Sequence, residues 1–345
     1  MSAERGTRNA EPPETTPGNE AGPGAIQVLS SAFHAPRSTL LVFDAVSKWY
    51  GPVIGVNQVS LGFAEGITGL VGANGAGKST LMRLATGLLR PDIGAVRVCG
   101  RDPWTAAARR HVGYCPDVDA FYEEMSGRQF VGAMARLSGF SRSEAKRRTE
   151  EVLLTVGMAD RAERKLAGYS KGMRQRIKLA QALIHDPEVL ILDEPLAGID
   201  PIGRQEMIAL FAGLAQRNKC LLVSSHELEE LEKLTEHVAI MARGRVAAVG
   251  PVAQIRDLLD DHPLSILIGT DRPRELAGVL LRQADVVGVD VGVGNRLVVR
   301  ARNPRRFFPD FARLVLEENI PVDHLETLDD STHAVLGYLL GGSGK

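Results

Sequence analysis

The chain has 345 residues, and at about 150 residues per domain this length suggests two domains. Its 41 Lys and Arg residues nearly balance 42 Asp and Glu residues, so the net charge of −1 creates no overall field that would draw the protein to nucleic acid. Hydrophobic residues form 44% of the sequence without a run long enough to cross a membrane, and the N-terminus lacks the apolar core of a secretory signal. The three cysteines have neither zinc nor disulfide spacing, which favours the reducing cytosol.

The first predicted segment is a disordered tail. Residues 1–38 are rich in proline and glycine and show almost no apolar periodicity, so they cannot bury enough surface to offset the entropy of the chain. Order is expected to begin near Thr39, because residues 40–43 form a strand-like apolar run.

Residues 39–262 are predicted to form an α/β domain, because short apolar runs alternate there with helical patterns. The runs that predict strands are residues 67–71, 189–192, 220–223, 238–241 and 246–249. Two of them, residues 189–192 and 220–223, are continuously apolar, as expected of parallel strands buried on both faces. The last two runs flank a glycine and predict a hairpin, which adds antiparallel structure to the parallel core.

Residues 117–183 are predicted to be a helical insertion in this domain. Phe130, Met134 and Leu137 recur at helical spacing, and Ser141 with Glu144 fits a capping box that opens the next helix. A last helix is expected to bury one face before it stops at an Asp-Pro pair. The residues of that face are Met173, Ile177, Ala180 and Ile184.

A small accessory domain is predicted over residues 263–345. Its pattern reads β-α-β-β-α-β, which is the order of a ferredoxin-like α+β unit. Strands are expected at residues 264–268, 286–291, 296–300 and 322–325, and helices at residues 274–283 and 304–318, with a short helix at residues 334–340.

A phosphate-binding turn is predicted between the strand at residues 67–71 and the helix expected at residues 78–89. Residues 72–80 fit the pattern G-x-x-x-x-G-K-[ST] in the strand–turn–helix context that this motif requires. Backbone N–H groups would turn inward on phosphate, and the helix N-terminus adds about half a positive charge. Lys78 is expected to reach the β- and γ-phosphates, and the Ser79 hydroxyl to bind Mg²⁺. The candidate residues of this turn are Gly72, Asn74, Gly75, Ala76, Gly77, Lys78, Ser79 and Thr80.

Two carboxylates follow directly on the buried strand of residues 189–192. Because the carboxyl ends of parallel strands face the ligand crevice of an open α/β sheet, Asp193 and Glu194 are expected beside the phosphates. Asp193 is placed to hold Mg²⁺, and Glu194 is the candidate general base that polarises the attacking water. GTP is disfavoured, since Asn218 and Lys219 are not followed by the aspartate of the Asn-Lys-x-Asp pattern of guanine-binding proteins.

With these motifs in place, residues 40–255 resemble the nucleotide-binding subunit of an ABC transporter. Residues 169–176, Tyr-Ser-Lys-Gly-Met-Arg-Gln-Arg, are similar to the signature segment of that family. Residues 196–201, Leu-Ala-Gly-Ile-Asp-Pro, are similar to its D-loop, and Ser-Ser-His at residues 224–226 matches the strand end that carries its switch histidine. The resemblance implies a P-loop NTPase fold that binds ATP and Mg²⁺.

The resemblance also implies roles for single residues. Ser170, which also fits a helix N-cap, would bind the γ-phosphate of ATP held by a second subunit, and His226 would contact the γ-phosphate as a catalytic residue with Glu194 and Lys78. Asp200 would lie at the seam between the subunits. Tyr50 would stack on adenine, with its neighbour Trp49 as the alternative. The signature residues implied in binding are Ser170, Lys171, Gly172 and Met173.

One position departs from the family pattern. The family usually has glutamine in the loop that joins the sheet to the helical insertion, where it touches Mg²⁺ and senses the membrane partner. Asp117 occupies that place here. Because a carboxylate also binds Mg²⁺, Asp117 joins Ser79 and Asp193 as a predicted metal ligand.

The resemblance implies an ATPase that powers transport by closing on ATP as a dimer, with a homodimer favoured, beneath separate polytopic membrane subunits. The implied location is the cytoplasmic face of the cell membrane, with no nucleic acid partner. The Tyr-Ser-Lys-Gly-Met signature and the added C-terminal domain resemble the subclass that serves exporters. The membrane subunits are expected to dock near residues 120–128, where Phe121 and Tyr122 either contact the partner or pack internally.

Two other classes stay open as alternatives. A soluble ABC-type ATPase of translation or repair would usually carry tandem ATPase units, long coiled coils or zinc spacings, which this sequence lacks. A regulatory protein with an inactive ATPase is disfavoured by the intact motif residues, whereas Asp117 slightly favours this class. Those intact residues are Lys78, Ser79, Asp193, Glu194 and His226.

Overall fold

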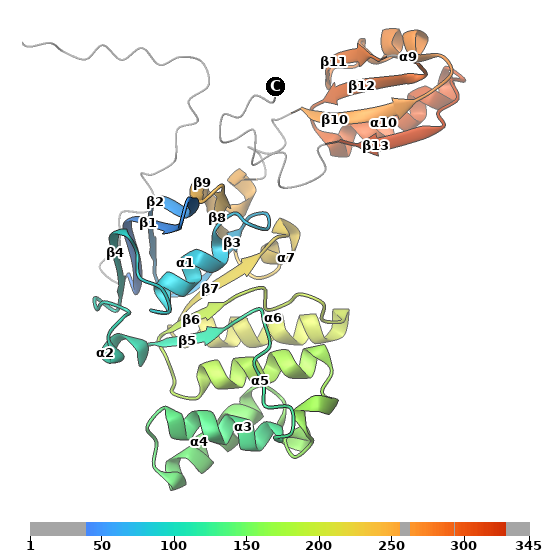
Figure 1. The fold of residues 1–345 in the computed structure, drawn as a ribbon. Helices are drawn as coiled ribbons and strands as arrows, with labels where there is room; N and C mark the ends of the chain where they lie inside the picture. The colour runs from blue at the N-terminus through green and yellow to red at the C-terminus, as the bar shows by residue number, and fades with distance from the viewer. Residues whose placement is uncertain (1–38, 256–262, 293, 329–345) are drawn as a thin grey trace, which may run out of the picture.

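The computed structural model describes residues 39–255, 263–292 and 294–328 (Figure 1). The predicted tail of residues 1–38 and the predicted short helix of residues 334–340 lie outside the described residues. Within the described ranges, none of the helices has the length and hydrophobicity of a membrane span.

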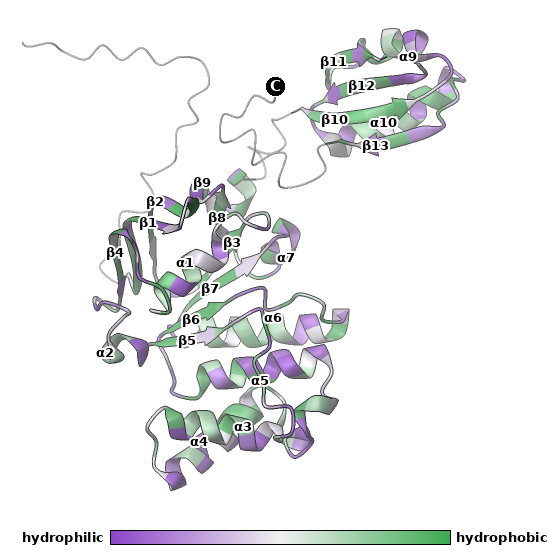
Figure 2. Ribbon diagram, in the orientation of Figure 1, coloured by the Kyte–Doolittle hydropathy of each residue, from purple (hydrophilic) through white to green (hydrophobic). Residues whose placement is uncertain are grey.

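A six-stranded sheet forms the centre of the first part of the chain, in the order β5-β6-β7-β3-β8-β9. The strands pair in parallel from β5 to β8, and β9 pairs antiparallel with β8, which confirms the predicted parallel core with a hairpin. All residues of β6 are buried, and Figure 2 shows β6 and β7 as hydrophobic strands. The strands are β3 (Gly66–Val71), β5 (Val112–Cys115), β6 (Val189–Leu192), β7 (Cys220–Ser225), β8 (His237–Ala242) and β9 (Arg245–Pro251).

A second sheet of three antiparallel strands, in the order β2-β1-β4, packs beside helix α1. The strands are β1 (Leu41–Tyr50), β2 (Val53–Phe63) and β4 (Ile93–Val98). Sequence reasoning predicted only the start of β1, because this sheet is irregular: β1 pairs with both neighbours through several register shifts, which blur the period of two.

The helices that accompany these sheets include α1 (Lys78–Ala85), α2 (Ala106–Arg109), α6 (Pro201–Ala215) and α7 (Leu228–Glu232). Helix α1 ends four residues before the predicted end at Leu89. Thr86 caps it, and Gly87 follows with φ of +69°, the left-handed conformation that commonly terminates a helix. A Cβ on Gly87 would also lie 2.1 Å from the carbonyl O of Pro103, so this turn requires glycine.

The predicted helical insertion is confirmed as α3 (Gly127–Leu137), α4 (Arg142–Thr155) and α5 (Lys171–Leu183), with short 3₁₀ turns at Ala159–Arg161 and Leu166–Gly168. The Ser141–Glu144 capping box is present at the start of α4. The predicted face of the last helix is buried throughout, from Met173 to Ile184. The helical spacing of Phe130, Met134 and Leu137 is confirmed by α3, although Phe130 is buried while Leu137, in the last turn, is 79% exposed.

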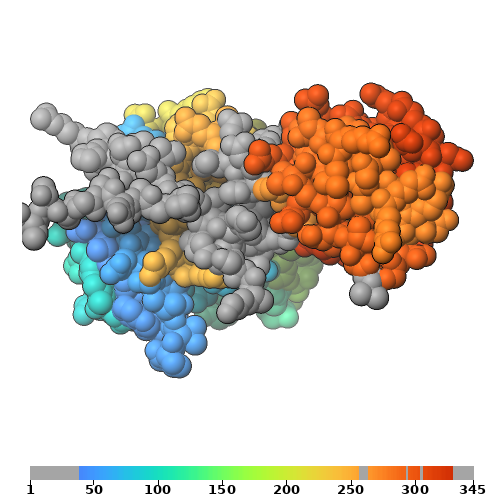
Figure 3. Space-filling model, turned by 90° about the horizontal axis from the view of Figure 1, so that it is seen from above, coloured from blue at the N-terminus to red at the C-terminus, as the bar shows by residue number. Residues whose placement is uncertain are grey.

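The last described part of the chain is a four-stranded antiparallel sheet in the order β11-β12-β10-β13, with helices α9 and α10. Its bounds are β10 (Leu264–Gly269), α9 (Pro273–Leu280), β11 (Val286–Val291), β12 (Arg296–Ala301), α10 (Pro304–Glu317) and β13 (His324–Thr327). This is the predicted ferredoxin-like order. Its apolar side chains form a hydrophobic core of their own. Figure 3 shows this part of the chain, in orange to red, as one lobe. The domain boundaries at residues 38 and 262 stay predictions.

Candidate functional site

The turn of residues 72–80 connects β3 to α1 and is shaped by glycine. Gly77 has φ of +104°, and a Cβ there would lie 2.5 Å from the carbonyl O of Gly55. A Cβ on Gly72 would lie 2.4 Å from the carbonyl O of Met241. Because α1 begins at Lys78, directly after this turn, its unpaired N–H groups and the positive end of its dipole face the turn.

Lys78 lies almost completely buried at the bottom of this turn, with 6% of its surface exposed. Its Nζ donates to the carbonyl O of Gly72 at 2.5 Å and lies 3.5 Å from Oε1 of Glu194. The ammonium group is therefore held between the turn and the end of β6, at the place from which it would reach a phosphate.

Asp193 and Glu194 follow β6 as predicted, and Ser224 fixes both of them. The Ser224 hydroxyl donates to Oδ1 of Asp193 at 2.7 Å and accepts from the backbone N–H of Glu194 at 2.8 Å. Asp193 is buried, and Glu194 has φ of +48°, an uncommon backbone conformation for a non-glycine residue. Sequence reasoning missed this role of Ser224, although its place near the end of the neighbouring parallel strand was a signal for it.

His226 follows β7 and lies at the same edge of the sheet. Its Nδ1 is 3.0 Å from Oε2 of Glu194, and its Nε2 is 3.6 Å from Oε1 of Glu227. The predicted histidine and the candidate base thus contact each other. Glu194 is held on one oxygen by Lys78 and on the other by His226.

Residues 73–80, Asp193 and Glu194 line a pocket of about 320 Å³, whereas His226 contacts Glu194 without lining the pocket itself. The described residues that line it are Val53, Ile54, Gly55, Ala73, Asn74, Gly75, Ala76, Gly77, Lys78, Ser79, Thr80, Asp117, Asp193 and Glu194. The predicted metal ligands Ser79, Asp117 and Asp193 all line this one pocket. Nowhere in the described ranges do three or more His, Cys, Asp or Glu side chains gather as a metal site. Two carboxylates and a hydroxyl suit Mg²⁺, which is usually bound by few carboxylates together with substrate phosphates.

Tyr50 lies at the edge of the pocket. Its hydroxyl is 3.4 Å from Oγ1 of Thr80, and its ring packs against Gly55, where a Cβ would lie only 2.8 Å from Cε2 of the ring. Tyr50 is exposed, whereas its neighbour Trp49 is half-buried. Val53 and Ile54, both exposed and both lining the pocket, add an apolar surface that sequence reasoning did not identify.

The signature residues stand apart from this pocket, and none of them lines it. Ser170 caps α5 by accepting from the backbone N–H of Met173 at 3.4 Å, and it is exposed, as are Lys171 and Asp200. Asp200 caps α6 by accepting from the N–H of Gly203 at 2.9 Å. The Lys171 side chain lies against Gly198, so the signature segment and the segment of residues 196–201 are neighbours.

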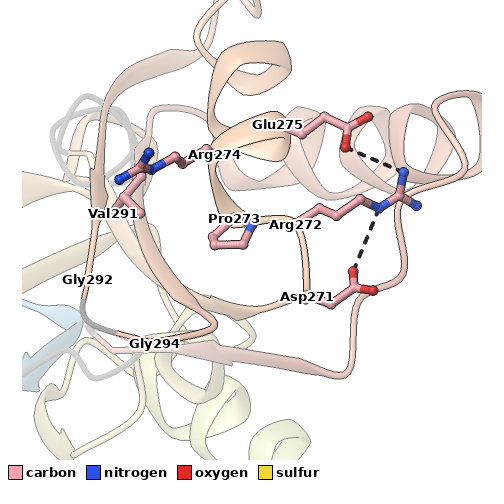
Figure 4. A pocket seen from close by; sticks show the side chains of 8 residues that line it. All are labelled: Asp271, Arg272, Pro273, Arg274, Glu275, Val291, Gly292 and Gly294. Atoms are coloured by element: carbon pink, nitrogen blue, oxygen red, sulfur yellow. Dashed lines mark hydrogen bonds and ion pairs between the residues drawn. The ribbon is translucent and has the colours of Figure 1, made fainter.

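A further pocket, of about 620 Å³, lies between the start of α9 and the turn after β11 (Figure 4). One of its two arginines pairs with both of its acidic side chains: Arg272 lies 3.7 Å from Asp271 and 3.4 Å from Glu275. The Arg274 side chain extends toward Val291 on the other side (Figure 4). Although this pocket is the larger one, it contains none of the phosphate-binding or carboxylate arrangement described above, and we assign it no ligand.

The two aromatic residues in the predicted docking region lie in different environments. Phe121 packs internally, with its ring edge-to-face against Phe130 at 5.1 Å between centroids. Tyr122 is 68% exposed. Of the two predicted possibilities, internal packing therefore holds for Phe121, whereas Tyr122 is available to a partner.

Comparison with known proteins gives the same assignment. The family model described as ABC transporter matches residues 56–197. The uncharacterized ABC transporter ATP-binding protein YxlF of Bacillus subtilis is 35% identical over 63% of this chain and 72% of its own length. The daunorubicin resistance ATP-binding protein DrrA3 of Streptomyces coeruleorubidus is 33% identical over 75% of this chain and 82% of its own length. The bacitracin transport ATP-binding protein BcrA of Bacillus licheniformis is 36% identical over 61% of this chain and 69% of its own length.

Solved structures show the same fold. The ATP-binding subunit of an ABC transporter has a TM-score of 0.58 and 29% identity, and the match covers 64% of this chain and 92% of that one. An ATP-binding cassette in its ADP conformation, MJ1267, has the same TM-score at 22% identity, over 65% of this chain and 95% of that one. The predicted P-loop fold and the suspected relationship are thereby confirmed, and the alternative of a soluble translation or repair ATPase is not favoured. The chain belongs to the family of ABC transporter ATP-binding proteins.

Proposed function

We propose that this protein binds and hydrolyses ATP to power export through separate membrane subunits. The observation that carries the proposal is the pocket that brings Lys78, Asp117, Asp193 and Glu194 together around the turn of residues 72–80. A buried cation, the end of a helix and three carboxylates on one pocket suit a magnesium-bound nucleoside triphosphate.

The side chains suggest the following division of labour. Lys78 and the N–H groups of the turn neutralise the β- and γ-phosphates, and Ser79, Asp117 and Asp193 would hold Mg²⁺, whose charge stabilises the transferring phosphoryl group. Glu194 accepts the proton of the attacking water, and His226, which contacts Glu194, keeps that carboxylate oriented and would contact the γ-phosphate once nucleotide is bound.

Two chains are needed for a complete site in this proposal. The chain contains one turn of residues 72–80 and one signature segment, and the signature residues do not line the pocket of their own chain. Ser170 and Met173 of one copy would therefore cover ATP held by the other copy. Binding energy closes the pair and hydrolysis opens it again, which supplies a mechanical cycle to membrane subunits on the cytoplasmic face.

Export is favoured over import by two observations. The relatives whose printed names state a role serve daunorubicin resistance, bacitracin transport, linearmycin resistance and Nod factor export. In addition, the signature segment has the sequence Tyr-Ser-Lys-Gly-Met and the chain continues into the ferredoxin-like part, two features that resemble the subclass serving exporters.

Two measurements test the proposal. Phosphate release by the purified chain should require Mg²⁺, and Lys78→Ala should weaken ATP binding in calorimetry; unchanged affinity would remove the pocket from the proposal. Affinity purification from membranes of the source cell should recover a polytopic membrane protein with the wild-type chain. Recovery of the chain with soluble partners alone would contradict a transport role.

A further inference from the structure

Ser225, the last residue of β7, shapes the turn that carries His226. Its Oγ accepts a hydrogen bond from the backbone N–H of Glu227 at 3.1 Å. A serine hydroxyl that bonds to the N–H two residues further on closes a tight turn around the residue between them. The side chain of His226 is 49% exposed, so packing does little to hold it. The place of the imidazole ring therefore depends on the backbone that Ser225 holds.

Glu230 orients the hydroxyl of Ser225. The hydroxyl donates to Oε2 of Glu230 at 2.7 Å, and both residues are buried, Ser225 completely and Glu230 with 5% of its surface exposed. A hydroxyl has one hydrogen, so once Glu230 accepts it, the oxygen lone pairs are left to accept the N–H of Glu227. Because both side chains are buried, losing the hydroxyl would leave a buried carboxylate oxygen without this partner.

Glu230 is itself held from two sides. It lies on α7, which contacts β7 and β3 (Figure 1). The next residue, Leu231, is fully buried against β3, where a Cβ on Gly69 would lie 2.9 Å from Cδ1 of Leu231. From α6, the guanidinium of Arg204 lies 3.6 Å from Oε1 of Glu230. Nε of Arg204 is buried without a hydrogen-bond partner in the described part of the chain. Since an unpaired buried donor costs stability, stability alone does not explain this arginine.

Ser224 and Ser225 serve different parts of the same edge of the sheet. Successive side chains of a strand point to opposite faces. Ser224 accordingly reaches the residues that follow β6, whereas Ser225 reaches α7. The two parts meet where Nδ1 of His226 lies 3.0 Å from Oε2 of Glu194. Ser225 does not line the nucleotide pocket, so its effect on the reaction would pass through His226.

We propose that Ser225 and Glu230 are positioning residues for His226: the hydrogen bond between them fixes the turn that presents the imidazole ring to the candidate base. Arg204 holds the carboxylate of Glu230 in place for this hydrogen bond. The inference rests on the proposed function, because it assumes that His226 takes part in the hydrolysis of ATP. It adds residues that do not line the pocket to the groups on which hydrolysis depends.

The test measures kcat and KM for ATP by phosphate release from the full chain with Mg²⁺. Ser225→Ala removes the hydroxyl, so the ring loses its fixed place, and kcat should fall by about 10- to 100-fold, the scale of a misplaced catalytic group. KM should change by less than about twofold, because the groups that bind the nucleotide are untouched. Ser225→Thr keeps a hydroxyl at this position and should recover most of the lost rate.

The decisive comparison repeats the substitution in a chain that lacks the histidine. His226→Ala should itself lower kcat. Because a positioning residue acts only through the group that it positions, adding Ser225→Ala to His226→Ala should lower kcat further by less than about twofold. A general loss of structure would instead lower kcat by the same factor in both chains.

A matched control is Glu229→Gln, which changes an exposed carboxylate next to Glu230 on α7. It should leave both kcat and KM unchanged. If Ser225→Ala shows no cooperative thermal transition, Glu230→Gln takes its place with the same expected results, because an amide is a weaker acceptor for the hydroxyl and forms no ion pair with Arg204.

A wild-type kcat in Ser225→Ala would overturn the inference, and so would an equal fall in kcat with and without His226. A rise in KM at an unchanged kcat would overturn it too. All three outcomes leave the proposed function standing. A wild-type chain that releases no phosphate would instead overturn the proposed function, and a His226→Ala variant as active as the wild type would overturn the part that His226 plays in it; either result overturns the inference as well.

Discussion

The nucleotide pocket and the signature segment differ in how their polar groups are satisfied. In the pocket, Lys78 and Asp193 are both buried. Lys78 donates a hydrogen bond to Gly72 and forms an ion pair with Glu194, and Asp193 accepts a hydrogen bond from Ser224. In the signature segment, Ser170 is exposed and uses its hydroxyl only to cap α5 among the described hydrogen bonds. One region is preorganised by its own core, and the other is presented at the surface.

This contrast indicates where a second chain is required. A group that must stabilise developing charge gains most when it is fixed and desolvated, as in the pocket. A group that completes a neighbour's site must stay accessible until the neighbour arrives. The pocket should therefore bind nucleotide alone, whereas turnover should need both regions.

The largest expected effect is that of Glu194→Gln. Glutamine keeps the shape but cannot accept a proton, so turnover should fall by about 10²- to 10⁴-fold while ATP binding is retained. Phosphate release and calorimetry measure the two quantities. Hydrolysis at the wild-type rate would remove Glu194 as the base. Glu188→Gln, which alters an exposed carboxylate paired with His111, is the control.

Two substitutions of Ser170 separate its two roles. Aspartate caps helices as well as serine does, so Ser170→Asp should keep the thermal stability but repel phosphate and abolish ATP-dependent dimerisation. Ser170→Ala should cost about 1 kcal/mol of stability through loss of the cap. Thermal unfolding and sedimentation are the measurements. Full dimerisation of Ser170→Asp would place Ser170 away from the partner's ATP.

Asp117→Asn tests the position that departs from the family pattern. Asparagine keeps an oxygen but loses the charge, so the Mg²⁺ concentration for half-maximal turnover should rise by about tenfold. Glu124→Gln changes an exposed carboxylate of the same loop and should have no such effect. If the Mg²⁺ requirement of Asp117→Asn equals that of the wild type, Asp117 is not a ligand.

The smallest effect concerns the pH dependence of folding near the pocket's sheet. His185 hydrogen-bonds to the carbonyl O of Val112 in β5, and burial holds the pKa of His185 below its ordinary value of 6.5. Below pH 6.5 the unfolded chain binds this proton more readily than the folded chain, so stability should fall with falling pH. His185→Gln should flatten that decline in thermal unfolding between pH 7.5 and 5.5; an equal slope would exclude His185 as its source.

The sequence predicted the pocket better than its surroundings, for a physical reason. Residues 72–80 are contiguous, and Asp193 and His226 follow strands whose parallel order brings their ends to one edge. The hydrogen bond from Ser224 to Asp193 depends on the register between β6 and β7, which local sequence patterns do not determine. The hydrogen bond from Lys178 Nζ to the carbonyl O of Asp117 was not predicted, because the two residues are 61 positions apart in the sequence and no local signal marks such a pair.

The fold shows the same division between local and distant information. Caps and turns at Ser141 and around Gly244 obey local rules and were predicted correctly. The sheet β2-β1-β4 depends on pairing between distant strands with shifted register, and most of it was not predicted. Leu137 followed the helical period but lies at the last turn of α3, where no other element covers it enough to bury it.

The most direct test of the two-chain site is to mix two inactive variants, Lys78→Ala and Ser170→Asp, and to measure phosphate release. In a mixed pair, one site carries both defects, whereas the other combines an intact Lys78 from one chain with an intact Ser170 from the other. We expect activity to appear on mixing, at up to about half the wild-type rate per mixed pair, since one of two sites is restored. A mixture no more active than its separate components, at concentrations where mixed pairs form, would contradict it.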